Sequence, residues 1–265
     1  MYFDEKGIKC IYTIRITLIN AKFTAIFFSM KIQNRYMGEK VLVIGHRGAK
    51  GYVSENTMAS IEKALSFGVD GIEIDVHMCK TGELMVFHDY TLDRLTDGKG
   101  EISKMTLSEL KRLKVENTYE IPTLIEVLNC IDKRCLVNIE LKGRNTAKEA
   151  ERIIELYVET KGWKYDDFIV SSFQHHELET MFKRNKSIPL GVLTKANLDE
   201  AIEFAVTINA VAIHPNFALL SNDNVSVAKQ LGYKIYTWSV NEAKTIARMK
   251  RYKVDGIISD FPDRV

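Results

Sequence analysis

Strand-like and helix-like segments alternate along this chain from Val41 to the C-terminus, and this alternation restricts the fold more than any other feature of the sequence. Repeated strand–helix units form a parallel sheet with helices packed against it, so the pattern predicts an α/β protein. We predict strands at 41–45, 71–77, 84–88, 135–141, 167–172, 188–193, 210–214, 234–239 and 256–259. We predict helices at 57–67, 107–114, 123–131, 145–160, 175–185, 197–206, 222–231 and 241–251. Three residues stand where helix N-caps are expected, namely Asn56, Thr106 and Asn241.

One pair of predicted strands is joined by a link too short for a helix. The segments 71–77 and 84–88 are separated by residues that include Lys80–Glu83, with a Thr-Gly turn signal, so we interpret 71–88 as a β-hairpin. The eight remaining strands are each separated by a helix, which predicts a (β/α)8 TIM barrel with a β-hairpin extension after the second strand. The alternative, an open doubly wound sheet, needs a Gly-rich phosphate loop, and the glycines of 45–51 form no GxGxxG motif.

The first part of the chain lacks this alternation. The apolar stretch 8–32 is interrupted by basic residues, and its longest later uncharged run, 23–30, is shorter than the about twenty apolar residues that span a bilayer. A signal peptide would need an unbroken apolar core and a small-residue cleavage site, and neither is clear. We expect one folded domain at 37–265. Residues 1–36 are then an N-terminal appendage of uncertain structure or the product of an early start codon.

Acidic and apolar residues alternate within one predicted strand, 71–76. Successive side chains of a strand point to opposite faces, so Glu73 and Asp75 share one face and apolar side chains share the other. Two adjacent carboxylates repel each other, and their burial without a partner is unfavourable. The pattern therefore indicates that this strand holds a cation.

A second predicted strand, within 136–142, repeats the pattern. Glu140 and Lys142 share its polar face. In a barrel wrapped by helices, Glu140 would meet Glu73 and Asp75, and three carboxylates suit a hard divalent cation. The alternative is ordinary salt bridging between these acids and basic side chains, Lys142 and Arg47 among them.

Two histidines are placed for proton transfer. His46 follows the first strand and would lie at the C-terminal mouth of the barrel, where active sites of this fold occur. The hairpin brings His88 roughly opposite Asp75. Together with the acids, Arg47 and Lys142, the two imidazoles indicate phosphoryl chemistry, in which one takes a proton while the other gives one. We expect structural roles for the other histidines, His77, His175, His176 and His214.

The motifs resemble those of the glycerophosphodiester phosphodiesterase family, and the likeness runs along nearly the whole chain after Met37. Its segments, in the family's order, are 46–48 with 55–57, 73–76, 86–89, 92–94 with 96–98, 121–124, 138–142, 238–241 and 255–258. Three positions depart from the pattern, with Ser54 in place of a usual proline and Leu95 and Ile125 in place of more typical polar residues.

The resemblance implies a metal site and an acid–base pair. Glu73, Asp75 and Glu140 would hold one divalent cation, Mg²⁺ or Ca²⁺. His46 and His88 would be the general base and the general acid.

The resemblance also implies the substrate contacts and the reaction. Arg47 and Lys142 would bind the phosphate, and Trp238, with Phe173, would line the glycerol pocket. The glycerol 2-hydroxyl would attack phosphorus and expel an alcohol, and water would open the resulting cyclic phosphate to sn-glycerol 3-phosphate. Two alternatives use the same barrel: a lysophospholipase D, and a catalytically inactive phosphodiester-binding protein.

Composition narrows the setting. The 265 residues are 46% hydrophobic and 27% charged, and the net charge of +2 gives no footprint for nucleic acid. The four cysteines show neither metal spacing nor a disulfide framework, as in a reducing compartment. From this composition we expect a cytoplasmic protein without membrane association, and the resemblance implies that it is an enzyme of lipid or glycerol metabolism that acts on a small molecule.

Overall fold

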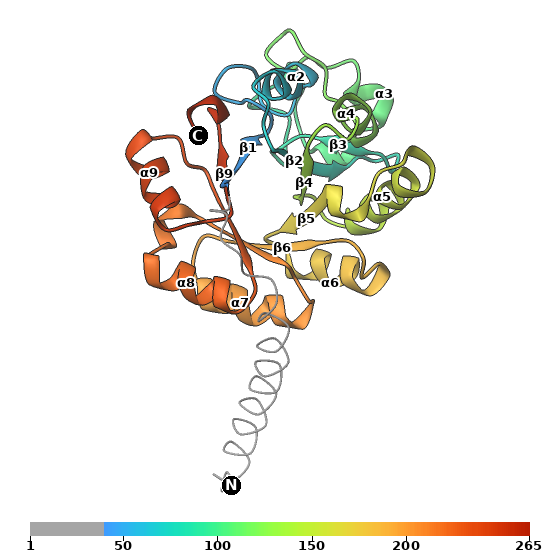
Figure 1. Cartoon of the computed structure of the whole chain (residues 1–265). Coiled ribbons are helices and arrows are strands. Elements are labelled where there is room, and N and C mark those ends of the chain that lie inside the picture. Colours follow the sequence, from blue (N-terminus) through green and yellow to red (C-terminus); the bar gives the residue numbers. More distant parts are fainter. Residues whose placement is uncertain (1–39) are drawn as a thin grey trace, which may run out of the picture. The chain divides into compact units, whose positions relative to one another are not determined.

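Eight parallel strands close into a barrel in this computed structural model, which describes residues 40–265 (Figure 1). The barrel strands are β1 (Leu42–His46), β2 (Gly71–Met78), β4 (Leu136–Leu141), β5 (Phe168–Ser172), β6 (Leu190–Thr194), β7 (Ala212–Pro215), β8 (Lys234–Thr237) and β9 (Gly256–Ser259). They neighbour one another in this order, and β1 closes the barrel by pairing with both β2 and β9. The predicted TIM barrel is confirmed.

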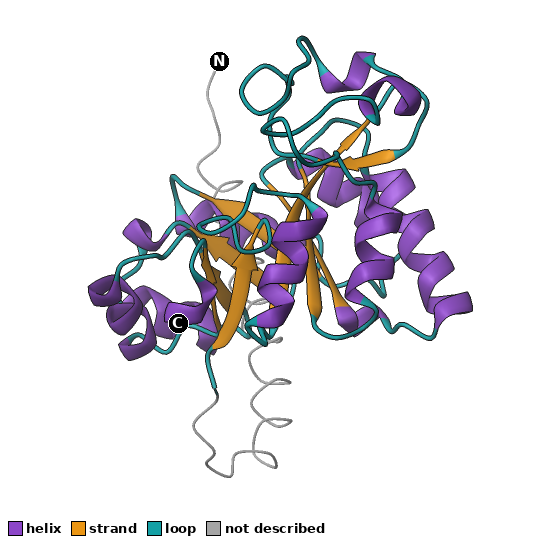
Figure 2. Ribbon diagram, turned by 90° about the horizontal axis from the view of Figure 1, so that it is seen from above, coloured by secondary structure: helices purple, strands orange, loops and turns teal. Residues whose placement is uncertain are grey.

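The helices pack around the outside of the barrel, and Figure 2 shows the strands lying inside this helical layer. They are α2 (Met58–Ser66), α3 (Leu107–Leu110), α4 (Leu124–Ile131), α5 (Ala147–Lys161), α6 (His175–Arg184), α7 (Leu198–Thr207), α8 (Asn222–Gln230) and α9 (Ala243–Arg251). The apolar side chains of β2, Ile72, Ile74 and Val76, are fully buried in the core between strands and helices. Burial of the apolar face leaves the acidic face of β2 directed into the barrel.

The predicted hairpin is also confirmed. Strand β3 (Leu84–Val86) runs antiparallel to β2, with Val76 opposite Val86. This register places Phe87, not His88, opposite Asp75, and the backbone N–H of Phe87 donates to the Asp75 carbonyl at 3.0 Å. His88 therefore lies beyond the end of β3, one residue further along than we expected. The segment that includes β3 and α3 has a small hydrophobic core of its own. Its buried residues are Cys79, Met85, Phe87, Leu92, Ile102, Leu110, Val115 and Ile121.

Only one of the three expected N-caps has that role. Thr106 caps α3 in a capping box with Glu109. The cap of α2 is Thr57, one residue after Asn56, and the cap position of α9 is Glu242, which makes no side-chain capping bond. The side chains of Asn56 and Asn241 instead bind carboxylates at the barrel mouth.

The lower part of the barrel interior is mainly apolar, with Ile44, Ile169, Ala212, Tyr236 and Ile258 packed together. Polar side chains follow them toward the C-terminal ends of the strands, so the fold directs its chemistry to one mouth. Within the described part of the chain, no helix is both long and apolar enough to cross a membrane. The predicted boundary at residue 37 lies outside the described residues.

Candidate active site

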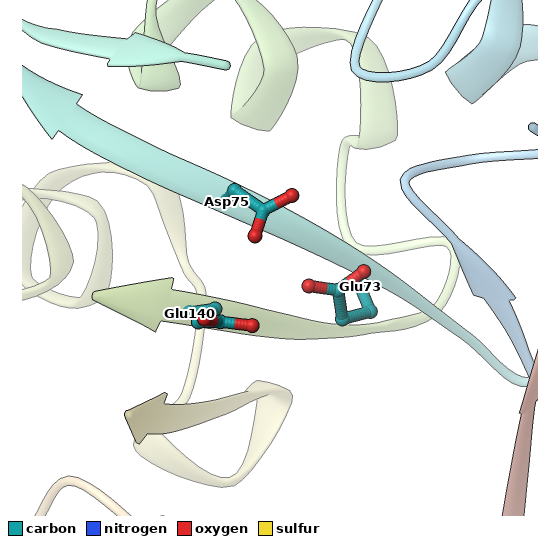
Figure 3. Close-up of side chains that lie close together, drawn as sticks. All are labelled: Glu73, Asp75 and Glu140. Carbon is teal, nitrogen blue, oxygen red and sulfur yellow. The ribbon is translucent and has the colours of Figure 1, made fainter. Parts of the chain in front are cut away.

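The three predicted carboxylates converge at the barrel mouth (Figure 3). Glu73 and Asp75 extend from β2, and Glu140, on the neighbouring strand β4, is the register partner of Asp75. One carboxylate oxygen from each residue lies within 4.8 Å of the other two. The exposed fractions are only 4% for Glu73, 1% for Asp75 and 8% for Glu140. Three buried acids at this spacing form a site into which a cation fits.

The acids of this cluster titrate differently because their surroundings differ. Burial, together with repulsion within the cluster, raises the pKa of Glu73 well above its usual value and the pKa of Glu140 to about 7. Burial also acts to raise the pKa of Asp75. The positive charge of Arg47 and further partners outweigh burial, so the pKa of that carboxyl is lowered. Oxygen ligands of this kind suit a hard divalent cation, whose charge would relieve the repulsion.

His46, the last residue of β1, is fixed from behind by a carboxylate. Its Nδ1 lies 2.5 Å from Oδ1 of Asp260, and the other Asp260 oxygen accepts a hydrogen bond from Asn241 Nδ2 at 2.9 Å. Its Nε2 faces the acidic cluster, 3.9 Å from Oε2 of Glu73. Burial lowers the pKa of His46. Burial acts to raise the pKa of Asp260, but the hydrogen bond with His46 outweighs it, and this pKa is lowered to about 2. The ring therefore presents Nε2 to the site.

His88 has the same kind of support on the other side of the mouth. Its Nδ1 lies 2.6 Å from Oδ1 of Asp89. Arg94 donates to both oxygens of Asp89, from Nε at 2.5 Å and from Nη2 at 3.0 Å, and these bonds lower the pKa of Asp89. His77 Nε2 lies 3.0 Å from the backbone carbonyl of His88, so this histidine has the structural role we expected. Both candidate acid–base residues thus carry a carboxylate on Nδ1 and leave Nε2 for chemistry.

The two predicted phosphate-binding residues contact the acidic cluster. The backbone N–H of Arg47 donates to Glu73 at 3.0 Å, and its Nε lies 3.2 Å from Oδ2 of Asp75. Lys142 Nζ lies 3.1 Å from Oε1 of Glu140 and 3.8 Å from Oδ1 of Asp75. The three acids therefore converge as predicted, and they also form the salt bridges with basic side chains that we considered as the alternative.

The two predicted aromatic residues lie together beside this centre. The rings of Phe173 and Trp238 meet edge to face, with their centroids 5.6 Å apart, and Trp238 Nε1 donates to the His214 carbonyl at 2.8 Å. Lys142 Nζ is 5.9 Å from the centroid of the Phe173 ring. With 37% of its surface exposed, Phe173 remains available to a ligand.

Several contacts around the site were missed by sequence reasoning. Asp260, Asp89 and Arg94 hold the two histidines, and Asn56 Nδ2 donates to Asp75 at 2.9 Å. Asp260 did carry a usable signal, because it directly follows the last barrel strand, as a residue at the C-terminal mouth should.

Fold and site together define a TIM-barrel enzyme with the side chains for phosphoryl chemistry. Residues 46–264 match the model of the glycerophosphoryl diester phosphodiesterase family. A glycerophosphodiester phosphodiesterase from Caldanaerobacter subterraneus is 36% identical over 235 residues, covering 84% of this chain and 96% of the relative. One from Bacillus altitudinis is 37% identical over 239 residues, covering 84% and 95%.

Solved structures agree with these relatives. A phosphodiesterase from Oleispira antarctica, determined in complex with the product sn-glycerol 3-phosphate, superposes with a TM-score of 0.77 at 29% identity, covering 84% of this chain and 94% of that one. The chain therefore belongs to the glycerophosphoryl diester phosphodiesterase family and is a phosphodiester hydrolase.

The raised pKa values predict that a divalent cation stabilises the chain more at pH 8 than at pH 5. At pH 5, Glu140, whose pKa is raised to about 7, holds a proton that a cation must displace, whereas at pH 8 it is ionised, and the raised pKa of Glu73 acts in the same direction. Without a metal, the same two carboxyls make the chain less stable as the pH rises. A carboxyl whose pKa is raised on folding contributes stability below its unfolded pKa and loses it as the pH rises toward the folded value.

Thermal unfolding with and without Mg²⁺ or Ca²⁺ across this pH range measures the effect. The cation-induced rise in Tm should grow with pH in the wild type and be largely lost in Glu140→Gln. An equal rise at both pH values, or an undiminished rise in the variant, would contradict the assignment of the cluster.

Proposed function

We propose that the chain hydrolyses glycerophosphodiesters to sn-glycerol 3-phosphate and an alcohol, using one divalent cation, Mg²⁺ or Ca²⁺, held by Glu73, Asp75 and Glu140. The observation that carries the proposal is the buried acidic cluster, with oxygens within 4.8 Å of one another, beside two imidazoles that each contact a carboxylate through Nδ1, one of which, His46, has its Nε2 3.9 Å from Glu73. The product bound to the Oleispira relative supports the choice of substrate.

Each imidazole takes one side of the reaction. His46 Nε2 accepts the proton of the glycerol 2-hydroxyl as its oxygen attacks phosphorus, and His88 Nε2 gives a proton to the oxygen of the departing alcohol. The product of this step is a cyclic phosphate. In the second step the roles reverse. The oxygen of a water molecule attacks phosphorus as His88 takes a proton from it, and the bond between phosphorus and the 2-oxygen breaks as His46 returns a proton to that oxygen. A bound cation would neutralise negative charge on the non-bridging phosphate oxygens.

The basic and aromatic side chains position the substrate. Arg47 and Lys142 provide positive charge next to the phosphate, and each is already oriented by a carboxylate of the cluster. The Phe173–Trp238 pair provides an apolar wall for the glycerol carbons. Because Lys142 is close to both the acids and Phe173, it joins the phosphate site to this wall.

The cysteines bear on where the enzyme works. In the described residues Cys79, Cys130 and Cys135 are all free thiols. Free thiols fit a reducing compartment, and we place the enzyme in the cytoplasm on this ground.

Turnover of glycerophosphocholine, measured as free sn-glycerol 3-phosphate, tests the proposal directly. The full chain should be active with Mg²⁺ or Ca²⁺ and inactive in excess EDTA. Glu73→Gln and Asp75→Asn should remove most of the activity because each deletes a ligand charge, whereas Glu159→Gln, on the exposed surface of α5, is the control.

Full activity in EDTA would refute the metal assignment. Turnover of lysophosphatidylcholine without turnover of glycerophosphocholine would identify a lysophospholipase D. Tight binding of glycerophosphocholine without turnover would identify a phosphodiester-binding protein.

The two histidines should respond differently to the leaving group. His46→Ala and His88→Ala should each lower kcat on glycerophosphocholine by roughly 10²–10⁴-fold, the usual contribution of a positioned acid or base. A nitrophenyl ester of glycerol phosphate needs little protonation of its leaving group, so it should partly restore kcat in His88→Ala and not in His46→Ala. Equal restoration in both variants would show that the assigned roles are wrong.

We further propose that residues 37–265 form the whole catalytic domain. The family match begins at residue 46, and the Caldanaerobacter relative is covered over 96% of its length by 84% of this chain. A chain shortened to 37–265 should keep its kcat/KM on glycerophosphocholine within about twofold. If residues 1–36 bind lipid surfaces, only activity on vesicle substrates should fall. Loss of folding, or of activity on the soluble substrate, would show that the domain boundary is wrong.

A further inference from the structure

We propose that Arg94 is a positioning residue for the general acid His88, acting through Asp89 and anchored to the rest of the site by Glu55. The inference rests on the proposed function, in which His88 protonates the departing alcohol. It adds three residues to that function, none of which needs to touch the phosphate.

A continuous chain of charged contacts joins His88 to the metal-binding cluster. Arg94 grips Asp89 through Nε and Nη2, and the same Nη2 donates to Oε1 of Glu55 at 2.7 Å. That Glu55 oxygen also accepts from Nη1 of Arg47 at 2.8 Å. Since Arg47 Nε lies 3.2 Å from Asp75, the chain runs from the imidazole to a metal ligand without a gap.

His88 needs such support because of its place in the fold. His46 is part of a barrel strand, whereas His88 follows β3, which ends at Val86. The contact that orients its ring is the one with Asp89, whose own side chain is 23% exposed. An exposed carboxylate on a loop can rotate. The planar guanidinium of Arg94 holds both of its oxygens, which fixes the direction of the hydrogen bond to Nδ1.

The burial of Glu55 makes the anchor rigid. Its side chain is 5% exposed, while that of Arg94 is 48% exposed. A buried carboxylate shared by two guanidinium groups stays ionised and in place, and burial without them would be unfavourable. Glu55 therefore ties the half-exposed Arg94 to the buried Arg47.

The support of His46 is built differently. Its carboxylate, Asp260, directly follows strand β9 and accepts a hydrogen bond from the neutral amide of Asn241, with Lys50 Nζ, the nearest cation in the described part of the chain, 4.0 Å away. The two histidines thus share a carboxylate on Nδ1, but only the His88 carboxylate is gripped by an arginine within the described residues. Loss of Arg94 should consequently affect the step that uses His88 as an acid and spare the other imidazole.

Kinetics on two substrates test the proposal in the full chain. Arg94→Gln should lower kcat on glycerophosphocholine by about ten- to a hundredfold, as a misplaced catalytic group does, with little change in KM. On the nitrophenyl ester of glycerol phosphate the loss should nearly vanish, because that leaving group needs no acid. Arg94→Lys keeps the charge but not the planar fork, so it should restore part of kcat and also carries the test if Arg94→Gln does not fold.

A matched control is available elsewhere in the barrel. Arg152 of α5 grips both oxygens of Glu149, through Nε at 2.8 Å and Nη2 at 2.6 Å, and its side chain is 55% exposed. Arg152→Gln removes an arginine–carboxylate clamp of the same kind and should leave kcat unchanged on both substrates. Its thermal unfolding shows what the loss of such a clamp does to stability alone.

The double variant His88→Ala/Arg94→Gln decides the route of the effect. If Arg94 acts through His88, adding Arg94→Gln to His88→Ala should change kcat by less than about twofold. Equal losses on both substrates, or losses that multiply in the double variant, would overturn the inference and leave the proposed function intact. No turnover of either substrate by the wild-type chain would overturn the proposed function and the inference with it.

Discussion

Repulsion among three buried carboxylates is the constraint on which the rest of this structure depends. Glu73, Asp75 and Glu140 bring oxygens within 4.8 Å of one another while all three side chains are buried. Flexible side chains on loops would move apart, but these stand on adjacent strands of a closed barrel whose outer face is locked by apolar packing. The barrel thus supplies the rigidity that keeps like charges together, and Arg47 and Lys142 supply the positive charge that makes the arrangement tolerable.

The position of a residue relative to the barrel explains how much additional support it needs. The three acids of the cluster lie within strands and are fixed by the ladder itself. His46 is at a strand end and has one carboxylate, Asp260, held by an amide and by the end of β9. His88 lies past a strand, and its carboxylate is held through both oxygens by Arg94, whereas the nearest cation to Asp260 among the described residues, Lys50, is 4.0 Å away. The two-point clamp thus stands behind the histidine that no strand holds, where a ring nitrogen most needs to be kept in a fixed place.

Most of the fold and the acidic cluster could be predicted because their signals are local. The strand–helix alternation, the short 80–83 link and the period of two in β2 each occupy a few consecutive residues. The support of the histidines could not be predicted in this way, since its contacts join distant segments. Asn56 and Asn241 show the limit. An asparagine before a helix suits an N-cap, and nothing nearby reveals that a distant carboxylate binds its side chain more favourably.

The loop between β1 and α2 has its conformation set before any ligand arrives. Arg47 and Asn56 adopt left-handed backbone angles, with φ of 52° and 57°, which are unfavourable for residues with a side chain. The backbone N–H of Asn56 donates to the Arg47 carbonyl at 3.0 Å, and Ser60 Oγ donates to the same carbonyl at 2.9 Å. At Gly48 a Cβ would come within 2.6 Å of the Ser60 backbone, so the loop lies directly against the helix. Local strain is thus balanced by contacts that point Arg47 at the acids and return Glu55 to it, and through Glu55 the same loop holds Arg94, which grips the carboxylate beside His88.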